Sequence, residues 1–70
     1  MNVNKLKGKI VEQGITTAQL AKQIGINRAT LYRKLANPDT ISLKDIAAII
    51  RILNLNANET TAIFFNDSVA

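Results

Sequence analysis

The side chains best suited to chemistry in this 70-residue chain are its cations, because the sequence contains neither cysteine nor histidine. Disulfides, zinc-finger sites, thiol nucleophiles and histidine acid–base catalysis are therefore excluded. Residues 1–36 carry seven cations and one carboxylate, a balance of +6, whereas residues 37–70 carry two cations and four carboxylates, a balance of −2. Chance can produce such an asymmetry in a short chain, but it makes the first half suited to contact a polyanion.

The carboxylates do not form the pattern of an enzyme site. The five Asp and Glu residues are scattered, and no spacing places two of them on one helix face. The sequence also has no glycine-rich phosphate loop and no cluster with metal-ligand spacing. We therefore expect a protein that is not an enzyme and that needs no cofactor, metal or small-molecule ligand.

The composition is typical of a single globular domain, which we expect to span residues 1–70. Apolar residues make up 47% of the chain and charged residues 20%. The longest uncharged apolar run, residues 46–50, is far too short to cross a bilayer, and the N-terminus does not resemble a signal peptide. The first helix lacks the aromatic anchor of a membrane-surface helix. These features predict a cytoplasmic protein without a membrane partner.

Apolar residues recur at three- and four-residue spacing, and no alternating run is long enough for a strand. Helix starts are marked by Asn27 and by the capping pairs Thr16–Gln19, Ser42–Asp45 and Asn56–Glu59. Helix ends are marked by Gly14, Gly25, Asn54 and the Asn37-Pro38 step. The expected helices run from Val3 up to Gly14, from Thr16 to Gly25, from Arg28 to Ala36, from Leu43 to about Leu53, and from Asn56 through Phe65. The predicted fold class is all-α, a compact bundle of five short helices.

Residues 17–35 combine the features that a helix-turn-helix requires. Ala21 lies where the two helices approach most closely, so a larger side chain would push them apart. Gly25 lies where the turn needs a positive φ, which costs a residue with a Cβ about 1–2 kcal/mol. The apolar residues expected to close the core beneath these helices are Leu20, Ile24, Ile26 and Leu31.

With this pattern the chain resembles the lambda-repressor/Cro-type helix-turn-helix family, also called XRE-like. The residues that carry the resemblance are Leu20-Ala21, Ile24-Gly25-Ile26, Leu31 and Leu35. The resemblance extends over nearly the whole chain, because the family also has one leading and two trailing helices. It implies a sequence-specific regulator of transcription that binds double-stranded DNA. The length is closest to a stand-alone phage or prophage Cro-like repressor, since full-length lambda-type repressors carry an additional C-terminal dimerisation domain.

The sequence departs from the family at one position of the third helix. Many members have an apolar residue three positions after the one matched by Leu31, but here that residue is Lys34 and the apolar side chain follows at Leu35. A slight rotation of the helix end would accommodate this change. Contacts beyond Arg33 are therefore harder to assign from the resemblance.

In such a motif the second helix enters the major groove and the first crosses the DNA backbone. Arg33 lies about 200° from Leu31 on a helical wheel and points away from the core. Ala29 and Thr30 fall on the same outer side, so Thr30 is also a candidate for reading bases. Arg28 lies on a flank at the helix start. The resemblance implies base contacts at Arg28, Ala29 and Arg33, with arginine favouring guanine and alanine a thymine methyl. The alternative for each arginine is a solvated surface charge.

Asn27 and Tyr32 each allow two interpretations. The Asn27 side chain caps the third helix or binds a base or phosphate, and capping is favoured. Tyr32 donates a hydrogen bond to a phosphate or packs on the fourth helix.

Other polar residues are candidates for phosphate contacts, which position a protein on DNA without reading its sequence. Thr17 and Gln19 stand at the start of the second helix, where free backbone N–H groups favour a phosphate. Lys34 is expected to add phosphate attraction, and Asn37 and Thr40 are similar to family positions that contact the DNA backbone. Lys7 and Lys9 on the first helix extend this contact or, as the favoured interpretation, form a solvated face.

The two phenylalanines, Phe64 and Phe65, are adjacent, so on a helix they cannot face the same core. We expect one to be buried and the other to form, with Val69, a patch that joins two subunits into a homodimer that is weak without DNA. The alternative is that both are buried. A competing function is a protein-interaction module, such as an antitoxin or antirepressor, built on the same scaffold.

Overall fold

The computed structural model describes residues 1–65, which contain five α-helices, one 3-10 turn and no strand. The elements are α1 (Val3–Glu12), α2 (Thr17–Ile24), α3 (Arg28–Ala36), η1 (Pro38–Thr40), α4 (Leu43–Leu53) and α5 (Ala57–Phe64). The all-α prediction is confirmed for this part of the chain. One boundary was wrong, because Phe65 is the C-cap residue that follows α5 and does not belong to the helix.

The helices begin where side chains can satisfy the backbone N–H groups of a first turn. Three of them start with a capping box, in which the N-cap and N3 residues each accept the other's backbone N–H. These pairs are Thr16 with Gln19, Ser42 with Asp45, and Asn56 with Glu59. All three were predicted from the sequence, and they fix the start of α2, α4 and α5.

Left-handed residues follow three of the helices, as the sequence predicted. Gly14, Gly25 and Asn54 have φ angles of 76°, 93° and 52°. A residue in this conformation ends a helix and redirects the chain, and glycine or asparagine adopts it at the lowest cost. Asn37 in turn ends α3 before Pro38, which begins η1.

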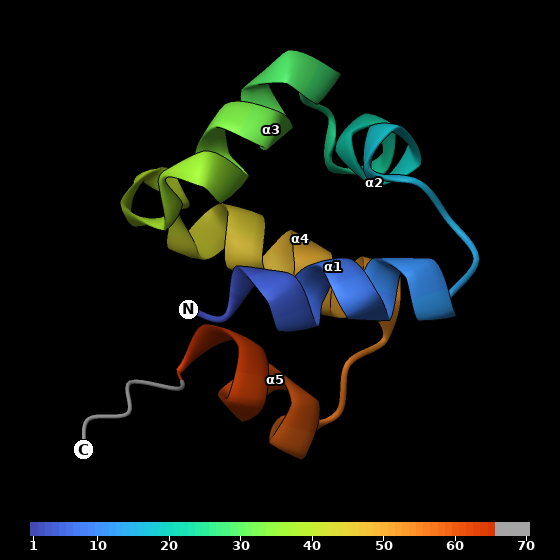
Figure 1. Ribbon diagram of the computed structural model, residues 1–70, viewed down its shortest axis with the longest axis vertical. Coiled ribbons are helices and arrows are strands. Elements are labelled where there is room, and N and C mark those ends of the chain that lie inside the picture. Colours follow the sequence, from blue (N-terminus) through green and yellow to red (C-terminus); the bar gives the residue numbers. More distant parts are fainter. Residues whose placement is uncertain (66–70) are drawn as a thin grey trace.

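One apolar cluster occupies the centre of the domain, and every α-helix contributes to it. In Figure 1, α2 and α3 lie on one side of α1 and α4, and α5 lies on the other. The most completely buried large side chains are Leu6, Leu20, Leu31, Ile49, Leu53 and Ile63. Because these residues recur at helical spacing, each helix turns one apolar stripe inward and leaves its opposite face exposed.

Two long-range hydrogen bonds hold α1 in place. The Asn2 backbone N–H donates to the carbonyl of Ile63 at 2.6 Å, which joins the start of α1 to α5. The Gln13 side chain donates to the carbonyl of Leu53 at 2.9 Å, which joins the end of α1 to α4. Within the described residues, no helix has the length and apolar character needed to cross a membrane.

Candidate nucleic-acid interface

The corner between α2 and α3 has the geometry of a helix-turn-helix. The backbone N–H groups of Gly25 and Ile26 both donate to the carbonyl of Ala21, at 2.9 and 3.0 Å, and so close the turn. Ala21 is only 1% exposed, as expected for the point where the helices meet. A Cβ on Gly25 would meet no atom within 4 Å, so the left-handed backbone alone requires glycine there.

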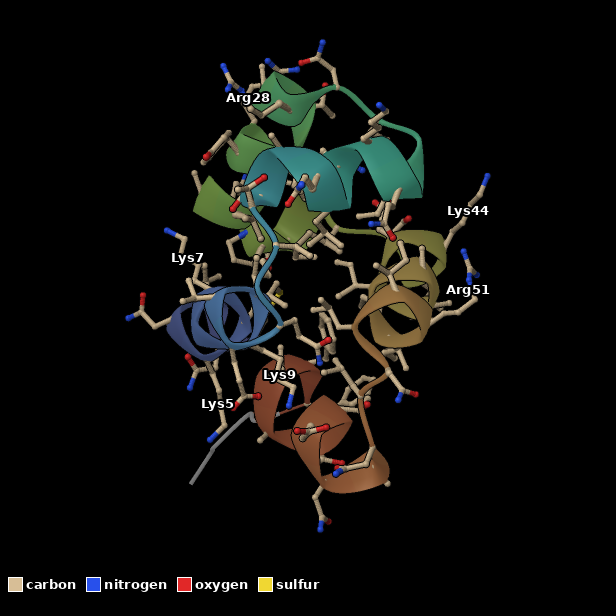
Figure 2. The ribbon with its side chains drawn as sticks, turned by 90° about the vertical axis from the view of Figure 1, so that its right-hand side faces the viewer. Lys5, Lys7, Lys9, Arg28, Lys44 and Arg51 are labelled. Atoms are coloured by element: carbon tan, nitrogen blue, oxygen red, sulfur yellow. The ribbon has the colours of Figure 1, made fainter. Side chains whose placement is uncertain are left out.

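Helix α3 is anchored on one face and free on the other. Leu31 and Leu35 are buried in the core. Arg28, Ala29 and Arg33 are all exposed, and Arg28 projects from the end of the molecule in Figure 2. The sequence therefore predicted correctly that Arg28, Ala29 and Arg33 are exposed while Leu31 and Leu35 are buried.

Thr30 lies less far outward than the helical wheel suggested, since it is half-buried. Its hydroxyl accepts a hydrogen bond from the guanidinium of Arg33 at 3.2 Å. The base-reading role expected of Thr30 thus competes with a supporting role, in which it orients the arginine one turn further along.

Asn27 caps α3, as the favoured interpretation predicted. Its side-chain oxygen accepts the backbone N–H of Ala29 at 2.7 Å. The side-chain amide N–H groups are then its remaining means of contacting DNA. Tyr32 is 51% exposed, so its ring packs only in part against the rest of the domain.

A groove of about 500 Å³ follows the exposed end of α3. It is lined by Thr30, Arg33, Lys34, Ala36, Asn37 and Thr40. The structure thus brings Arg33 together with three of the residues predicted to contact phosphates. Within this groove the Thr40 hydroxyl donates to the Asn37 carbonyl at 2.8 Å, so it must rotate before it can donate to a phosphate.

The start of α2 offers a second place for a phosphate. The Gln19 side-chain oxygen accepts the Thr16 N–H at 2.8 Å, and the Gln19 N–H donates to the Thr16 hydroxyl at 3.0 Å. These bonds leave the side-chain NH₂ of Gln19 as its donor. The backbone N–H of Thr17 has no acceptor within the helix because it belongs to the first turn.

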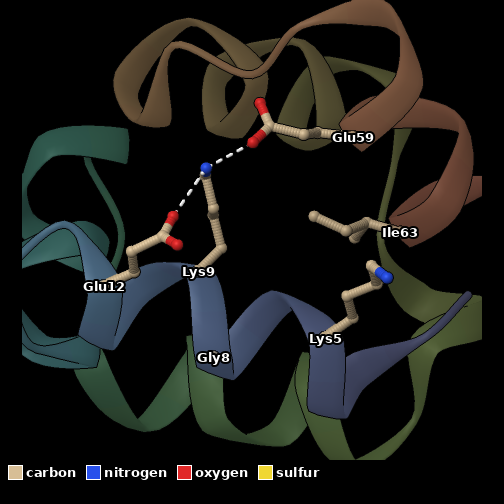
Figure 3. Close-up of a pocket in the computed structure, with 6 residues that line it drawn as sticks. All are labelled: Lys5, Gly8, Lys9, Glu12, Glu59 and Ile63. Carbon is tan, nitrogen blue, oxygen red and sulfur yellow. Dashed lines mark hydrogen bonds and ion pairs between the residues drawn. The ribbon is translucent and has the colours of Figure 1, made fainter.

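Two of the lysines considered for phosphate contacts have carboxylate partners. The Lys9 ammonium lies between Glu12, at 2.7 Å, and Glu59 of α5 (Figure 3). The hydrogen bonds to Glu12 and Glu59 raise the pKa of Lys9 above its ordinary value. Lys9 therefore joins α1 to α5, and the favoured interpretation of a solvated face was wrong, because its side chain is only 17% exposed.

Lys34 is the second paired cation. Its ammonium lies 2.5 Å from a carboxylate oxygen of Asp45, and the two side chains are only 23% and 13% exposed. The hydrogen bond from Lys34 is the main reason why the pKa of Asp45 is lowered. The phosphate attraction expected of Lys34 therefore has to compete with its ion pair to Asp45.

Sequence reasoning recognised Asp45 and Glu59 as helix-capping residues and missed their second role as ion-pair partners. Their partners, Lys34 and Lys9, are 11 and 50 residues away in the chain. Periodicity within one helix cannot show such pairs. The single available signal was the lysine at a position where the family commonly has an apolar residue, which needs a partner when it is partly buried.

Four of the five remaining Lys and Arg residues lie on two different sides of the molecule. In Figure 2, Lys5 and Lys7 project from α1, whereas Lys44 and Arg51 project from α4 on the opposite side. All four are exposed. One DNA duplex cannot contact both sides at once. Lys5 and Lys7 therefore form one group of charges, and Lys44 and Arg51 form another.

The residues expected in a dimer interface also differ from one another. Phe64 is 7% exposed and belongs to the core, whereas Phe65 is 57% exposed. The prediction that one of the pair is buried and the other is not is confirmed. Val69 lies outside the described residues.

An all-helical domain with a tight α2–α3 corner and an exposed, arginine-bearing α3 is the architecture of a helix-turn-helix DNA-binding protein. A family model for the Cro/C1-type HTH DNA-binding domain matches residues 5–59, from α1 into α5. The chain belongs to this family and is a DNA-binding transcription regulator whose partner is double-stranded DNA. The comparisons with curated proteins and with solved structures gave no match.

Proposed function

We propose that this protein is a Cro-like repressor of phage or prophage origin that binds a palindromic operator as a homodimer. The observation that carries the proposal is the outer face of α3, where Arg28, Ala29 and Arg33 are exposed on a helix held by Leu31 and Leu35. A rigid helix with free side chains at its N-terminal half fits the major groove. A regulator of this origin acts in the cytoplasm, where its DNA is.

In this proposal the residues of α3 divide the work of recognition. Arg28 and Arg33 donate to the O6 and N7 acceptors of guanine, and Ala29 contacts a thymine methyl group. Thr30 supports Arg33 through the hydrogen bond between their side chains. Asn27 adds a base or phosphate contact through its amide N–H groups.

Phosphate contacts flank this helix on both sides. Thr17 and Gln19 bind one phosphate at the start of α2, where the helix dipole adds to the free N–H groups. Tyr32, Asn37 and Thr40 contact the backbone beside the end of α3. These contacts set the orientation of the protein on the duplex and are the same for every sequence.

Dimerisation completes the proposal, because one α3 reads only half of a palindrome. Phe65 is the exposed member of the phenylalanine pair, and it is the last residue that the structure describes. We expect Phe65→Ser to weaken cooperative binding to a palindrome while leaving the helical circular-dichroism signal unchanged. Val11→Ser is the matched control, since Val11 is a 75% exposed apolar residue of α1.

The decisive experiment is selection of bound sequences from a random pool of DNA duplexes. The proposal predicts enrichment of a palindrome whose half-sites are one helical turn apart and contain guanine. With 6–10 phosphates contacted, affinity should fall by about 10³–10⁵ between about 50 and 200 mM salt. Failure to bind any duplex at low salt would contradict the proposal and favour a protein-interaction module.

A further inference from the structure

Lys34 occupies an unusual place for a cation of a DNA-binding helix. It lies on α3 directly after Arg33 and lines the same groove as Asn37 and Thr40. Its ammonium nevertheless contacts Asp45 of α4, at 2.5 Å. The side chain is long enough to reach either the carboxylate or the open groove, so Asp45 decides which anion it contacts.

Asp45 is a carboxylate with a fixed position. Its Oδ2 atom accepts a hydrogen bond from the Lys34 ammonium and another from the backbone N–H of Ser42, the latter at 3.3 Å. The Asp45 N–H in turn donates to the Ser42 hydroxyl at 3.2 Å. Because this capping box belongs to the first turn of α4, the carboxylate cannot follow Lys34 outward without opening the helix start.

It is also costly for Lys34 to leave Asp45 and pair with a DNA phosphate instead. Both side chains are largely covered, and a covered carboxylate that loses its cation pays a desolvation penalty that a surface carboxylate does not. The pair moreover joins the last turn of α3 to α4, which is the part of α3 where the sequence departs from the family pattern. Contact with DNA therefore has to compete with a favourable contact inside the protein.

From this geometry, and resting on the proposed function, we propose that Asp45 is a positioning residue that withholds Lys34 from the DNA phosphates and so limits both the affinity and the salt dependence of DNA binding. Cation–phosphate contacts supply nearly all of the affinity for non-specific DNA. Removing one such contact lowers binding to every sequence, while base contacts by Arg28 and Arg33 are kept. Asp45 thereby lowers the affinity for operator and non-specific DNA by the same factor, and it acts without touching DNA.

The test is the salt dependence of binding for the full chain and three variants, Asp45→Asn, Lys34→Met and the double substitution. Asparagine keeps an oxygen for the Ser42 N–H, and methionine keeps the apolar stem of the lysine. Binding is measured with a selected palindromic duplex and with a random duplex at several salt concentrations. Thermal unfolding of each variant sets a temperature at which all of them are folded.

We expect Asp45→Asn to steepen the slope of log affinity against log salt by about 0.9, the value for one added phosphate contact. Affinity should rise by the same factor for the palindromic and the random duplex, so the specificity ratio should not change. Lys34→Met should have the wild-type slope, and the double variant should match it. Asp39→Asn is the control for net charge, because Asp39 is exposed on η1 and shows no ion pair among residues 1–65.

An Asp45→Asn slope equal to that of Asp39→Asn overturns the inference, and so does a Lys34→Met slope that is shallower than wild type by about 0.9. The second result would mean that Lys34 already contacts a phosphate. If Asp45→Asn does not fold, the Lys34→Met slope alone decides between these outcomes. Wild-type protein that binds no duplex at low salt contradicts the proposed function itself, which separates the two failures.

Discussion

The outer face of α3 and the contact between α1 and α5 both contain cations, but in different surroundings. Arg28 and Arg33 are exposed, and no carboxylate among residues 1–65 pairs with them. Lys9 is held between Glu12 and Glu59. The comparison teaches that a cation is available to DNA only where no other element of the fold presents a carboxylate to it.

The ion pairs also change the interpretation of the charge balance between the two halves of the chain. Residues 1–36 carry an excess of +6, which suggested that this half of the chain contacts a polyanion. Two of its cations, Lys9 and Lys34, are paired with Glu59 and Asp45 from the other half. Folding therefore neutralises part of the positive charge of residues 1–36. The arginines of α3 remain the most direct place for a contact with DNA.

The largest expected effect comes from removing one exposed arginine, either Arg33 of α3 or Arg51 of α4. We expect Arg33→Ala to cost about 1–3 kcal/mol of discrimination at one base pair, because a bidentate contact to guanine is lost. Arg51→Ala, on the exposed face of α4, should change no base preference. Binding of both variants to single-base variants of a selected duplex measures this. Equal losses on specific and random DNA for Arg33→Ala would contradict its base-reading role.

A pair of glycine substitutions compares the backbones of the two regions. Both glycines have open space for a Cβ, but only Gly25 has a positive φ, whereas Gly8 lies within α1. Gly25→Ala should destabilise the fold by about 1–2 kcal/mol because alanine disfavours the left-handed conformation. Gly8→Ala should stabilise it by about 0.5–1 kcal/mol, since alanine loses less backbone entropy in a helix.

Urea unfolding followed by circular dichroism measures both glycine effects. The opposite signs are the critical result, because the two substitutions add the same methyl group. If both variants shift the unfolding midpoint in the same direction, the backbone geometry assigned to the α2–α3 corner is wrong.

The smallest expected effect is a change of stability with pH. Lys9 lowers the pKa of Glu59 below the ordinary value of 4.5, and Lys34 lowers that of Asp45 below 3.8. A carboxyl with a lowered folded-state pKa adds stability above its ordinary pKa and loses that contribution as the pH falls through the folded-state value. The free energy of unfolding should therefore decrease below about pH 4.5, the ordinary Glu59 value.

The variants Glu59→Gln and Asp45→Asn isolate the two contributions. Each should be less stable than wild type at neutral pH, and each difference should shrink as both carboxylates of the wild type become protonated. A difference that stays constant from neutral to acidic pH would assign the effect to packing or helix capping and not to charge.

The sequence predicted the helices well because their boundaries are set by local interactions. Capping boxes connect residues three apart, and the left-handed conformation of Gly25 and Asn54 depends on the residue itself. Helical periodicity likewise identified Leu31 and Leu35 as the buried side of α3. The one wrong boundary, at Phe65, lies at a helix end where no such residue marks the stop.

The candidate interface was predictable only in part. Exposure of Arg28, Ala29 and Arg33 follows from the position of the buried leucines on the same helix. The pairing of Lys34 with Asp45 does not follow from α3, because it depends on which residue of α4 lies beside its last turn. The supporting role of Thr30 likewise appears only when the side chains are placed.

The sequence by itself determined where the helices begin and end, which face of each is apolar, and that α2 and α3 meet at a glycine turn. These features arise from interactions between residues at most a few positions apart. Only the tertiary structure decided which cations remain free, because an ion pair between α3 and α4 or between α1 and α5 forms when packing brings distant residues within a few ångströms. Electrostatic energy depends on that distance and on burial, and the linear order of residues contains neither.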